Sequence, residues 1–269
     1  MVARPYPSVW PACLALLLMA GRAMDLLPAR AAEPSAIPDA GTESPEAAGQ
    51  SLAAELRGQR PAGNFTNSGV LRIRDAAGRR REVPLTITCQ VGESGAWHLQ
   101  YVARPGGETN ESLTVRHTTG VAPAYEVAWG RDGGVAEPPR AVPSGRSFEP
   151  FAGSDFWLAD LGLEFLHWSG QRLVGRELSN GRMCLVLESV NPGTAGYARV
   201  RSWVDAEYHG LLRAEAYDAQ RRLLKEFSTG SFRQITRSDG RELWVLKDLR
   251  IRDQVSDTRT DLLYDLPPQ

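Results

Sequence analysis

The residues of this chain that could do chemistry are scattered and form no known catalytic or metal-binding motif. Its four histidines include no pair at a metal-ligand spacing such as H-x-x-x-H: His98, His117, His167 and His209. There is no G-x-S-x-G elbow, no phosphate-cradling glycine loop and no dinucleotide fingerprint. We therefore expect no metal, no cofactor and no catalytic residue.

Two polar groups could still be read as catalytic, and each has a simpler structural explanation. Ser154 beside Asp155 is typical of a helix N-cap, where a side-chain oxygen accepts from an exposed backbone amide. Three acids could act as paired carboxylates: Asp205, Glu207 and Asp218. However, residues 206–210 are typical of a hairpin connection, in which acids are simply solvated. We expect a protein that is not an enzyme.

Two cysteines, Cys89 and Cys184, lie beyond the first 31 residues. An oxidising compartment would allow a bridge between them. Cys89 lies on the apolar side of an alternating run, where a free thiol behaves as a small hydrophobic residue. The sequence leaves open whether the two cysteines pair.

The charge balance argues against nucleic acid as a partner. The whole chain has 31 basic and 32 acidic residues, and residues 32–269 have a net charge of −3. Nucleic-acid binding proteins instead present a strongly basic face to the phosphates. We expect no nucleic-acid partner.

The first residues predict export. Arg4 precedes the apolar run 10–20, and residues 29–31 (Ala-Arg-Ala) have the small-x-small pattern of a signal-peptidase site. The apolar run is shorter than the about 17 to 25 residues that span a bilayer. Cys13 stands at the start of this run, which is the wrong place for a lipid anchor. We expect a cleaved signal peptide over residues 1–31 and an exported protein.

The rest of the chain divides into a leader and one domain. Residues 32–48 are rich in Pro, Ala, Glu and Ser and predict a disordered leader. Apolar residues at helical spacing predict a short amphipathic helix over residues 45–60, with Ser44 available as its cap. Residues 49–269 are then expected to form a single domain.

Alternating apolar and polar residues predict that this domain is mainly β. Leu71 and Ile73 alternate with arginines, and Leu85 and Ile87 alternate with threonines. Closely spaced Gly, Asn, Asp and Pro turns separate such runs, which favours antiparallel connections. We expect a curved antiparallel sheet of about eleven strands, with an N-terminal helix and an inserted helix. No βαβ alternation occurs, which argues against a doubly wound sheet.

One segment interrupts the strands. Residues 154–168 (SDFWLADLGLEFLHW) predict a helix that is apolar almost all round, so most of its sides must be covered. It could be a core helix that plugs the end of a barrel. It could also be a lid over an apolar concavity, because large amphipathic aromatic residues suit a surface that is covered at one time and offered to lipid at another.

The chain resembles the LolA-like family of outer-membrane lipoprotein-sorting proteins, mainly over residues 146–265. The resemblance is carried by the order and spacing of Gly153-Ser154-Asp155-Phe156, Asp160-Leu161, Trp168, Gly175-Arg176-Glu177, Tyr197, Trp203-Val204-Asp205, Ala216-Tyr217-Asp218, Leu224-Lys225-Glu226-Phe227 and Thr260. It implies an unclosed barrel around a helical lid, with acyl chains held between them. It also implies an arginine that fastens the lid, for which Arg72, Arg199 and Arg201 are candidates.

The resemblance implies a periplasmic carrier that binds lipoprotein acyl chains or phospholipid and helps sort them toward the outer membrane. An inner-membrane donor and an outer-membrane acceptor are the implied partners, with only transient membrane contact. The alternative is an envelope-stress or lipid-sensing module on the same fold. The expected lining residues are Phe156, Trp157, Leu161 and Phe165 of the lid and Leu71, Ile73, Leu85, Ile87, Leu185 and Leu187 of the sheet.

Overall fold

The structure is a computed structural model that describes residues 43–92, 95–106, 109–131, 137–236 and 242–266. The predicted signal peptide and residues 32–42 of the predicted leader lie outside the described residues. The leader boundary at residue 48 falls inside the first helix, which begins at Pro45.

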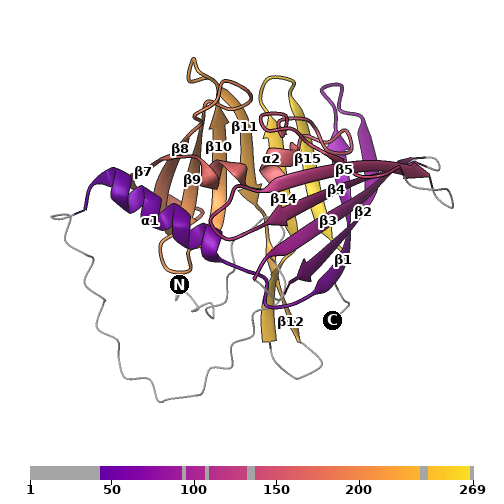
Figure 1. Cartoon of the computed structure of the whole chain (residues 1–269), viewed down its shortest axis with the longest axis horizontal. Coiled ribbons are helices and arrows are strands. Elements are labelled where there is room, and N and C mark those ends of the chain that lie inside the picture. The colour runs from indigo at the N-terminus through magenta and orange to yellow at the C-terminus, as the bar shows by residue number, and fades with distance from the viewer. Residues whose placement is uncertain (1–42, 93–94, 107–108, 132–136, 237–241, 267–269) are drawn as a thin grey trace.

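Most of the described chain forms one large, curved antiparallel sheet (Figure 1). Its first half holds β1 (Phe65–Arg74), β2 (Arg80–Val91), β3 (Trp97–Gly106), β4 (Thr109–His117), β5 (Ala124–Arg131) and β6 (Arg140–Ala141). Its second half holds β7 (Gly170–Ser179), β8 (Arg182–Val190), β9 (Arg199–Asp205), β10 (Leu211–Tyr217), β11 (Leu223–Thr229), β14 (Asp248–Asp253) and β15 (Thr258–Tyr264).

The strand order shows why the sheet is not closed. It runs β6-β5-β4-β3-β2-β1-β15-β14-β11-β10-β9-β8-β7, so β6 and β7 are its two edges. The halves join where β1 pairs with β15, with Leu71 opposite Leu262. The fold is mainly β and antiparallel with an unclosed sheet, which confirms the predicted fold class.

The described residues contain more strands than the about eleven expected from turn spacing. Thirteen strands form the large sheet, and β12 (Phe232–Thr236) pairs with β13 (Glu242–Leu246) in a separate two-stranded sheet. This hairpin projects beyond the large sheet in Figure 1. β6 has only two residues, which is too short for an alternating pattern to reveal it.

Alternation sets which side chains enter the core. Along β2, Val83, Leu85, Ile87 and Cys89 are buried, and the side chains between them are more exposed. Leu71 lies opposite Val83 in the neighbouring strand, so the same face continues across the sheet. The apolar residues of this face form one cluster with those of the segment that interrupts the strands.

The N-terminal helix α1 (Pro45–Gly58) starts where its cap predicts. The Ser44 side chain accepts a hydrogen bond from the Ala47 amide at 3.1 Å. Leu52, Ala53 and Leu56 are buried on one side of the helix. α1 lies beside β7 and contacts η1, so it covers part of the open side of the sheet (Figure 1). Among the described residues, no helix is long and apolar enough to cross a membrane.

Cys89 and Cys184 are both free. Cys89 belongs to the main core, whereas Cys184 lies in a small separate cluster with Val186, Trp203 and Leu212. Burial raises the pKa of the Cys89 thiol to about 11, which makes it a poor nucleophile. The two cysteines therefore do not pair, since they lie in separate apolar clusters.

Candidate functional site

The segment between β6 and β7 consists of turns and two short helices. We call its residues 151–168 the lid. It contains α2 (Leu158–Leu161) and the 3-10 helix η1 (Glu164–His167). The single helix predicted over residues 154–167 is therefore wrong in detail. Leu163 takes a left-handed conformation with φ 48°, which ends the regular helix between the two pieces.

A tertiary contact crowds the lid at this break. A Cβ atom added at Gly162 would lie 2.3 Å from the Tyr125 hydroxyl oxygen, so a larger residue there would force the Tyr125 side chain of β5 to shift. Helical periodicity alone carries no information about such a contact. The lid is held as a folded loop within the curve of the sheet (Figure 1).

The start of the lid also differs from the prediction. The Ser154 hydroxyl donates to the Phe151 carbonyl at 2.7 Å and accepts from the Phe156 amide at 3.2 Å, which makes a tight turn. The cap of α2 comes later, where the Trp157 amide donates to Asp160 Oδ2 at 2.8 Å. Ser154 has a structural role, but neither Ser154 nor Asp155 caps the helix.

Asp155 attaches the lid to β15. Its backbone amide donates to Thr260 Oγ1 at 3.0 Å, and that hydroxyl donates to Asp155 Oδ2 at 2.7 Å. The Thr258 hydroxyl donates to the other carboxylate oxygen. One lid side chain is thus bonded twice to the last strand of the sheet.

The deepest polar contact centres on Lys225 of β11, whose exposed fraction is only 3%. Its Nζ donates to the Asp155 carbonyl oxygen at 2.7 Å and lies 3.7 Å from Asp160 Oδ2. The Tyr197 hydroxyl donates to the same carboxylate, with oxygens at 2.9 and 3.1 Å. We call Asp155, Trp157, Asp160, Tyr197 and Lys225 the lid clamp.

Aromatic rings complete the lid clamp. The Lys225 ammonium lies 3.6 Å from the centroid of the Trp157 ring, a close cation–π contact. Trp157 stacks on Tyr197 with ring centroids 4.6 Å apart, and Phe148 meets both rings edge-on. The cation is therefore surrounded by lid groups on several sides.

Burial disfavours the charged forms of Lys225, Asp160 and Tyr197 in the lid clamp. It lowers the pKa of Lys225, and it raises the pKa of Asp160 and that of Tyr197. The attraction between the Lys225 ammonium and the Asp160 carboxylate opposes both of the first two shifts. Such a pair is stable only while its partners stay together.

The C-terminal end of the lid is attached to β7 and α1. The Gln171 amide of β7 donates to the carbonyls of Phe165 and Trp168 at 2.9 and 2.8 Å, and its oxygen accepts from Ser189 at 2.8 Å. Arg57 of α1 donates to the carbonyl of Leu166. The lid is held by polar contacts at both ends.

None of the three arginines suggested by the family resemblance contacts the lid. Arg72 pairs with Glu82 at 2.9 Å, and Arg199 and Arg201 pair with Glu188 at 3.4 and 3.0 Å. Sequence reasoning missed Lys225 as the buried cation. Two sequence features pointed to it. Lys225 lies two residues before Phe227 and so on the same face of a strand, and it is one of only two lysines, with Lys247.

The ten predicted lining residues converge in one apolar core. Eight are buried in the main cluster, and the other two are packed against it: Leu71, Ile73, Leu85, Ile87, Phe156, Leu161, Phe165 and Leu187, with Trp157 and Leu185. Trp157 and Leu185 are only partly buried. A ligand-binding role for these residues stays a prediction.

The space left between the lid and β9–β11 is small. It measures about 20 Å³ and is lined by Asp160, Phe165, Tyr197, Val200, Leu211, Ala214, Ala216, Lys225, Phe227 and Ile251. A cavity of that size has room for about one water molecule. Of the predicted lining residues only Phe165 borders it. In this state the lid itself fills the concave side of the sheet.

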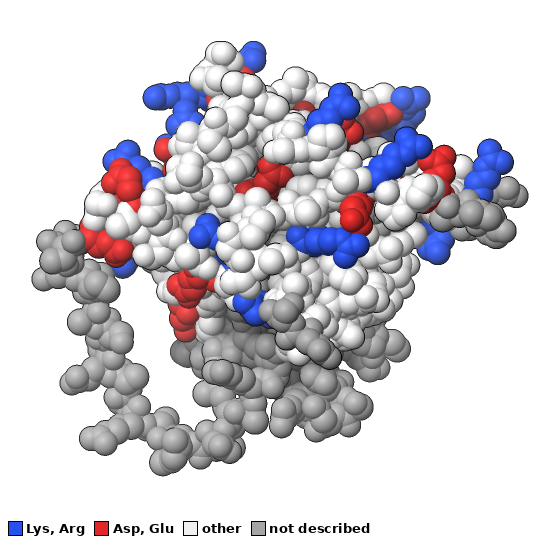
Figure 2. Space-filling model, viewed as in Figure 1, with Lys and Arg blue, Asp and Glu red and all other residues white. Residues whose placement is uncertain are grey.

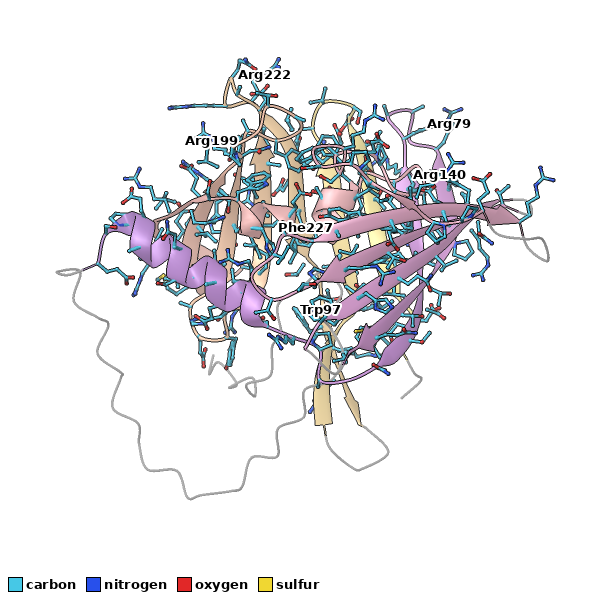
Figure 3. All side chains as sticks on the ribbon, viewed as in Figure 1. Arg79, Trp97, Arg140, Arg199, Arg222 and Phe227 are labelled. Atoms are coloured by element: carbon cyan, nitrogen blue, oxygen red, sulfur yellow. The ribbon has the colours of Figure 1, made fainter. Side chains whose placement is uncertain are left out.

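The charged side chains lie mainly around this core. Figure 3 shows Phe227 near the centre of the curved sheet, whereas Arg79, Arg140, Arg199 and Arg222 lie toward its periphery. On the face shown in Figure 2, blue and red atoms are interspersed between white ones. Among the described residues, no group of His, Cys, Asp or Glu side chains could hold a metal ion.

Several known proteins resemble this chain in sequence or in fold. A family model described only as an uncharacterized protein matches residues 136–266. No curated protein matches the sequence. Among solved structures, a DUF1329 family protein from Desulfovibrio piger is 20% identical with a TM-score of 0.65, covering 83% of this chain and 92% of that one.

Two further structures share the architecture. A putative outer membrane lipoprotein-sorting protein domain from Vibrio parahaemolyticus is 18% identical with a TM-score of 0.65, covering 82% of this chain and 92% of that one. A LolA superfamily protein from Nitrosomonas europaea is 17% identical with a TM-score of 0.54, covering 84% and 96%. The chain has the LolA-like fold. The resemblance seen in the sequence is confirmed for the fold.

Proposed function

We propose that this protein is a periplasmic carrier that binds lipoprotein acyl chains or phospholipid beneath its lid and helps sort them toward the outer membrane. One observation carries the proposal. An apolar lid occupies the concave side of an unclosed sheet, and a small set of buried polar contacts attaches it there. The description of the Vibrio neighbour as a putative lipoprotein-sorting domain supports the same class of function.

The size of the cavity defines how binding would proceed. Pockets that hold ligands are usually about 300 to 1,000 Å³, far above the 20 Å³ between the lid and β9–β11. An acyl chain can therefore enter this space only if the lid moves out. Each buried methylene contributes about 0.8 kcal/mol, so a few chains can offset the loss of the lid contacts.

Two lid positions would make the transfer reversible. With the lid in, the apolar face of the sheet is covered; with the lid out, the same face is open to acyl chains. A ligand shifts this balance only by its preference for the open state. The lid clamp then sets how strongly the closed state competes with the cargo.

We also propose that the protein acts in the periplasm between two membrane-associated partners. Export through a signal peptide over residues 1–31 would bring the domain into the periplasm. An inner-membrane donor would load it and an outer-membrane acceptor would unload it, with only transient membrane contact. The task needs an apolar surface and no catalytic group, in keeping with a carrier that is not an enzyme.

The test is lipid uptake by residues 32–269, purified from an exported form and measured by native mass spectrometry with a synthetic diacylated peptide. Trp157→Asp should weaken uptake by at least about tenfold, because chains bound beneath the lid would meet a charge in place of an apolar ring, a cost that outweighs the weaker lid clamp. Trp129→Asp is the matched control, since Trp129 is 43% exposed on β5. Equal uptake by both variants and the unaltered protein, or no uptake by any of them, contradicts the proposal.

A further inference from the structure

A second cavity opens at the other end of the lid, between α1, η1 and the ends of β3 and β4. Its volume is about 240 Å³. Arg57 and Arg60 reach it from the end of α1, His117 from the end of β4, and His167 from η1. We call this cavity the basic pocket.

The basic pocket is lined by cationic and neutral groups only. No Asp or Glu belongs to its lining, and within the described residues neither Arg57 nor Arg60 forms an ion pair. Arg57 donates to the Leu166 carbonyl, and Arg60 donates to Thr119 Oγ1 at 2.7 Å. A guanidinium has five N–H donors, so each retains donors beyond these bonds.

The two histidines are held close to these cations. His117 stacks on Trp97 with ring centroids 3.8 Å apart, and its buried Nε2 has no hydrogen-bond partner among the described residues. Burial and the neighbouring His167 lower the pKa of His117 to about 3. Burial and the neighbouring Arg57 lower the pKa of His167 to about 4.

The remaining walls of the pocket are apolar. Leu56, Leu163 and Leu166 border it and also belong to the main core beneath the lid. A ligand with an anionic head and apolar chains would thus meet cations at one end and the core at the other. The volume fits a small head group and is too small to hold the chains as well.

We propose that the basic pocket binds a phosphate group, as carried by the head group of an anionic phospholipid whose chains lie beneath the lid. Arginine binds phosphate oxygens through paired, charge-assisted hydrogen bonds. Arg57 also contacts the lid, so a phosphate here would bind beside the element that must move. The inference rests on the proposed function for the position of the chains, whereas the phosphate site stands without it.

The experiment compares dioctanoyl phosphatidic acid with dioctanoylglycerol, which has the same chains and no phosphate, using isothermal titration calorimetry on residues 32–269. The unaltered protein should bind the phosphatidic acid at least about tenfold more tightly. Arg57→Gln with Arg60→Gln should remove that preference, measured as the ratio of the two lipid affinities within the variant, because loss of the Arg57 bond to the lid would change both affinities alike. Arg72→Gln with Arg201→Gln, both outside the pocket, should retain it.

Arg60→Gln alone guards against a folding defect, because Arg60 is exposed and its side chain is hydrogen-bonded only to Thr119 among the described residues. It should reduce the preference partly. Titration with inorganic phosphate, followed by ³¹P NMR, distinguishes the sources: binding of phosphate with no preference between the lipids assigns the pocket to the free ion. Equal lipid affinities and no phosphate binding overturn the inference. Phosphate binding without any lipid uptake overturns the carrier function instead.

Discussion

Lys225 shows how one residue can control an element. Its ammonium is bonded to the lid backbone, faces the Asp160 carboxylate and lies over the Trp157 ring. Removing a charge from water is costly, and this cost is offset only while the lid supplies partners. When the lid moves out, the Lys225 ammonium must be solvated by water or paired with an anion. The solvation of Lys225 is therefore coupled to opening of the lid.

Lys225→Met should destabilise the protein by about 3 to 5 kcal/mol, because the Asp160 carboxylate loses its buried counter-ion. The loss should be larger at pH 8 than at pH 5. Burial already raises the pKa of Asp160, and a group with a raised folded pKa costs stability as the pH rises above its unfolded value. Urea unfolding at both pH values measures this.

Lys247→Met is the matched control for that variant, since Lys247 is the other lysine and is exposed. It should change the free energy of unfolding by less than about 0.5 kcal/mol. Adding Asp160→Asn to Lys225→Met should restore part of the lost stability at pH 8. A loss that is the same at both pH values would show that Asp160 does not depend on Lys225.

His117 gives a second pH effect at the residue scale. Its folded pKa of about 3 lies below the unfolded value, so the unfolded chain binds the extra proton as the pH falls below about 6.5. Stability is therefore present above that pH and lost on acidification, by up to about 2 kcal/mol at pH 5. His117→Phe, which keeps an aromatic ring against Trp97, should lose less stability between pH 7 and pH 5 in thermal unfolding. An unchanged difference would contradict the burial of a neutral His117.

At the scale of elements, α1 and the lid close the concave side together. α1 approaches β7 so closely that a Cβ atom at Gly49 would lie 2.5 Å from backbone atoms of Arg172. Backbone cannot move aside as a flexible side chain can. The position of α1 thus depends on a glycine inside a helix, where glycine otherwise lowers stability.

Gly49→Ala should loosen α1 from the sheet and destabilise the protein by about 1 to 3 kcal/mol, despite the higher helix propensity of alanine. Hydrogen exchange of the α1 amides should become faster. Gly58→Ala in the same helix is the control, because an added Cβ there meets nothing within 4 Å. Slower or equal exchange in Gly49→Ala would show that the helix does not rely on this contact.

Sequence reasoning succeeded where local patterns decide the structure. The burial of Leu85, Ile87 and Cys89 follows from their period of two, and the start of α1 follows from its Ser44 cap. It failed at the lid, where a left-handed Leu163 ends a helix that the periodicity predicts. It also missed Lys225, because a lysine on the same strand face as Phe227 does not by itself show that its ammonium is buried.

At the scale of the whole molecule, the open sheet is the feature that permits a carrier. A closed barrel has no free edge strands, whereas β6 and β7 are the unpaired edges of this sheet. The opening between such edges is where a lid could move out. The lid clamp and the basic pocket lie at different parts of the lid. Chains and head group could thus be bound by separate sets of residues.

The most direct test of the carrier function is photo-crosslinking of residues 32–269 with a lipid that has a diazirine in its acyl chain, followed by peptide mapping. The account predicts adducts on the strands beneath the lid, at Val200, Ala214 or Phe227, and on lid residues such as Phe165. These adducts should decrease when unlabelled lipid competes. Adducts confined to exposed residues such as Leu178 and Val255, or unaffected by competition, would contradict binding beneath the lid.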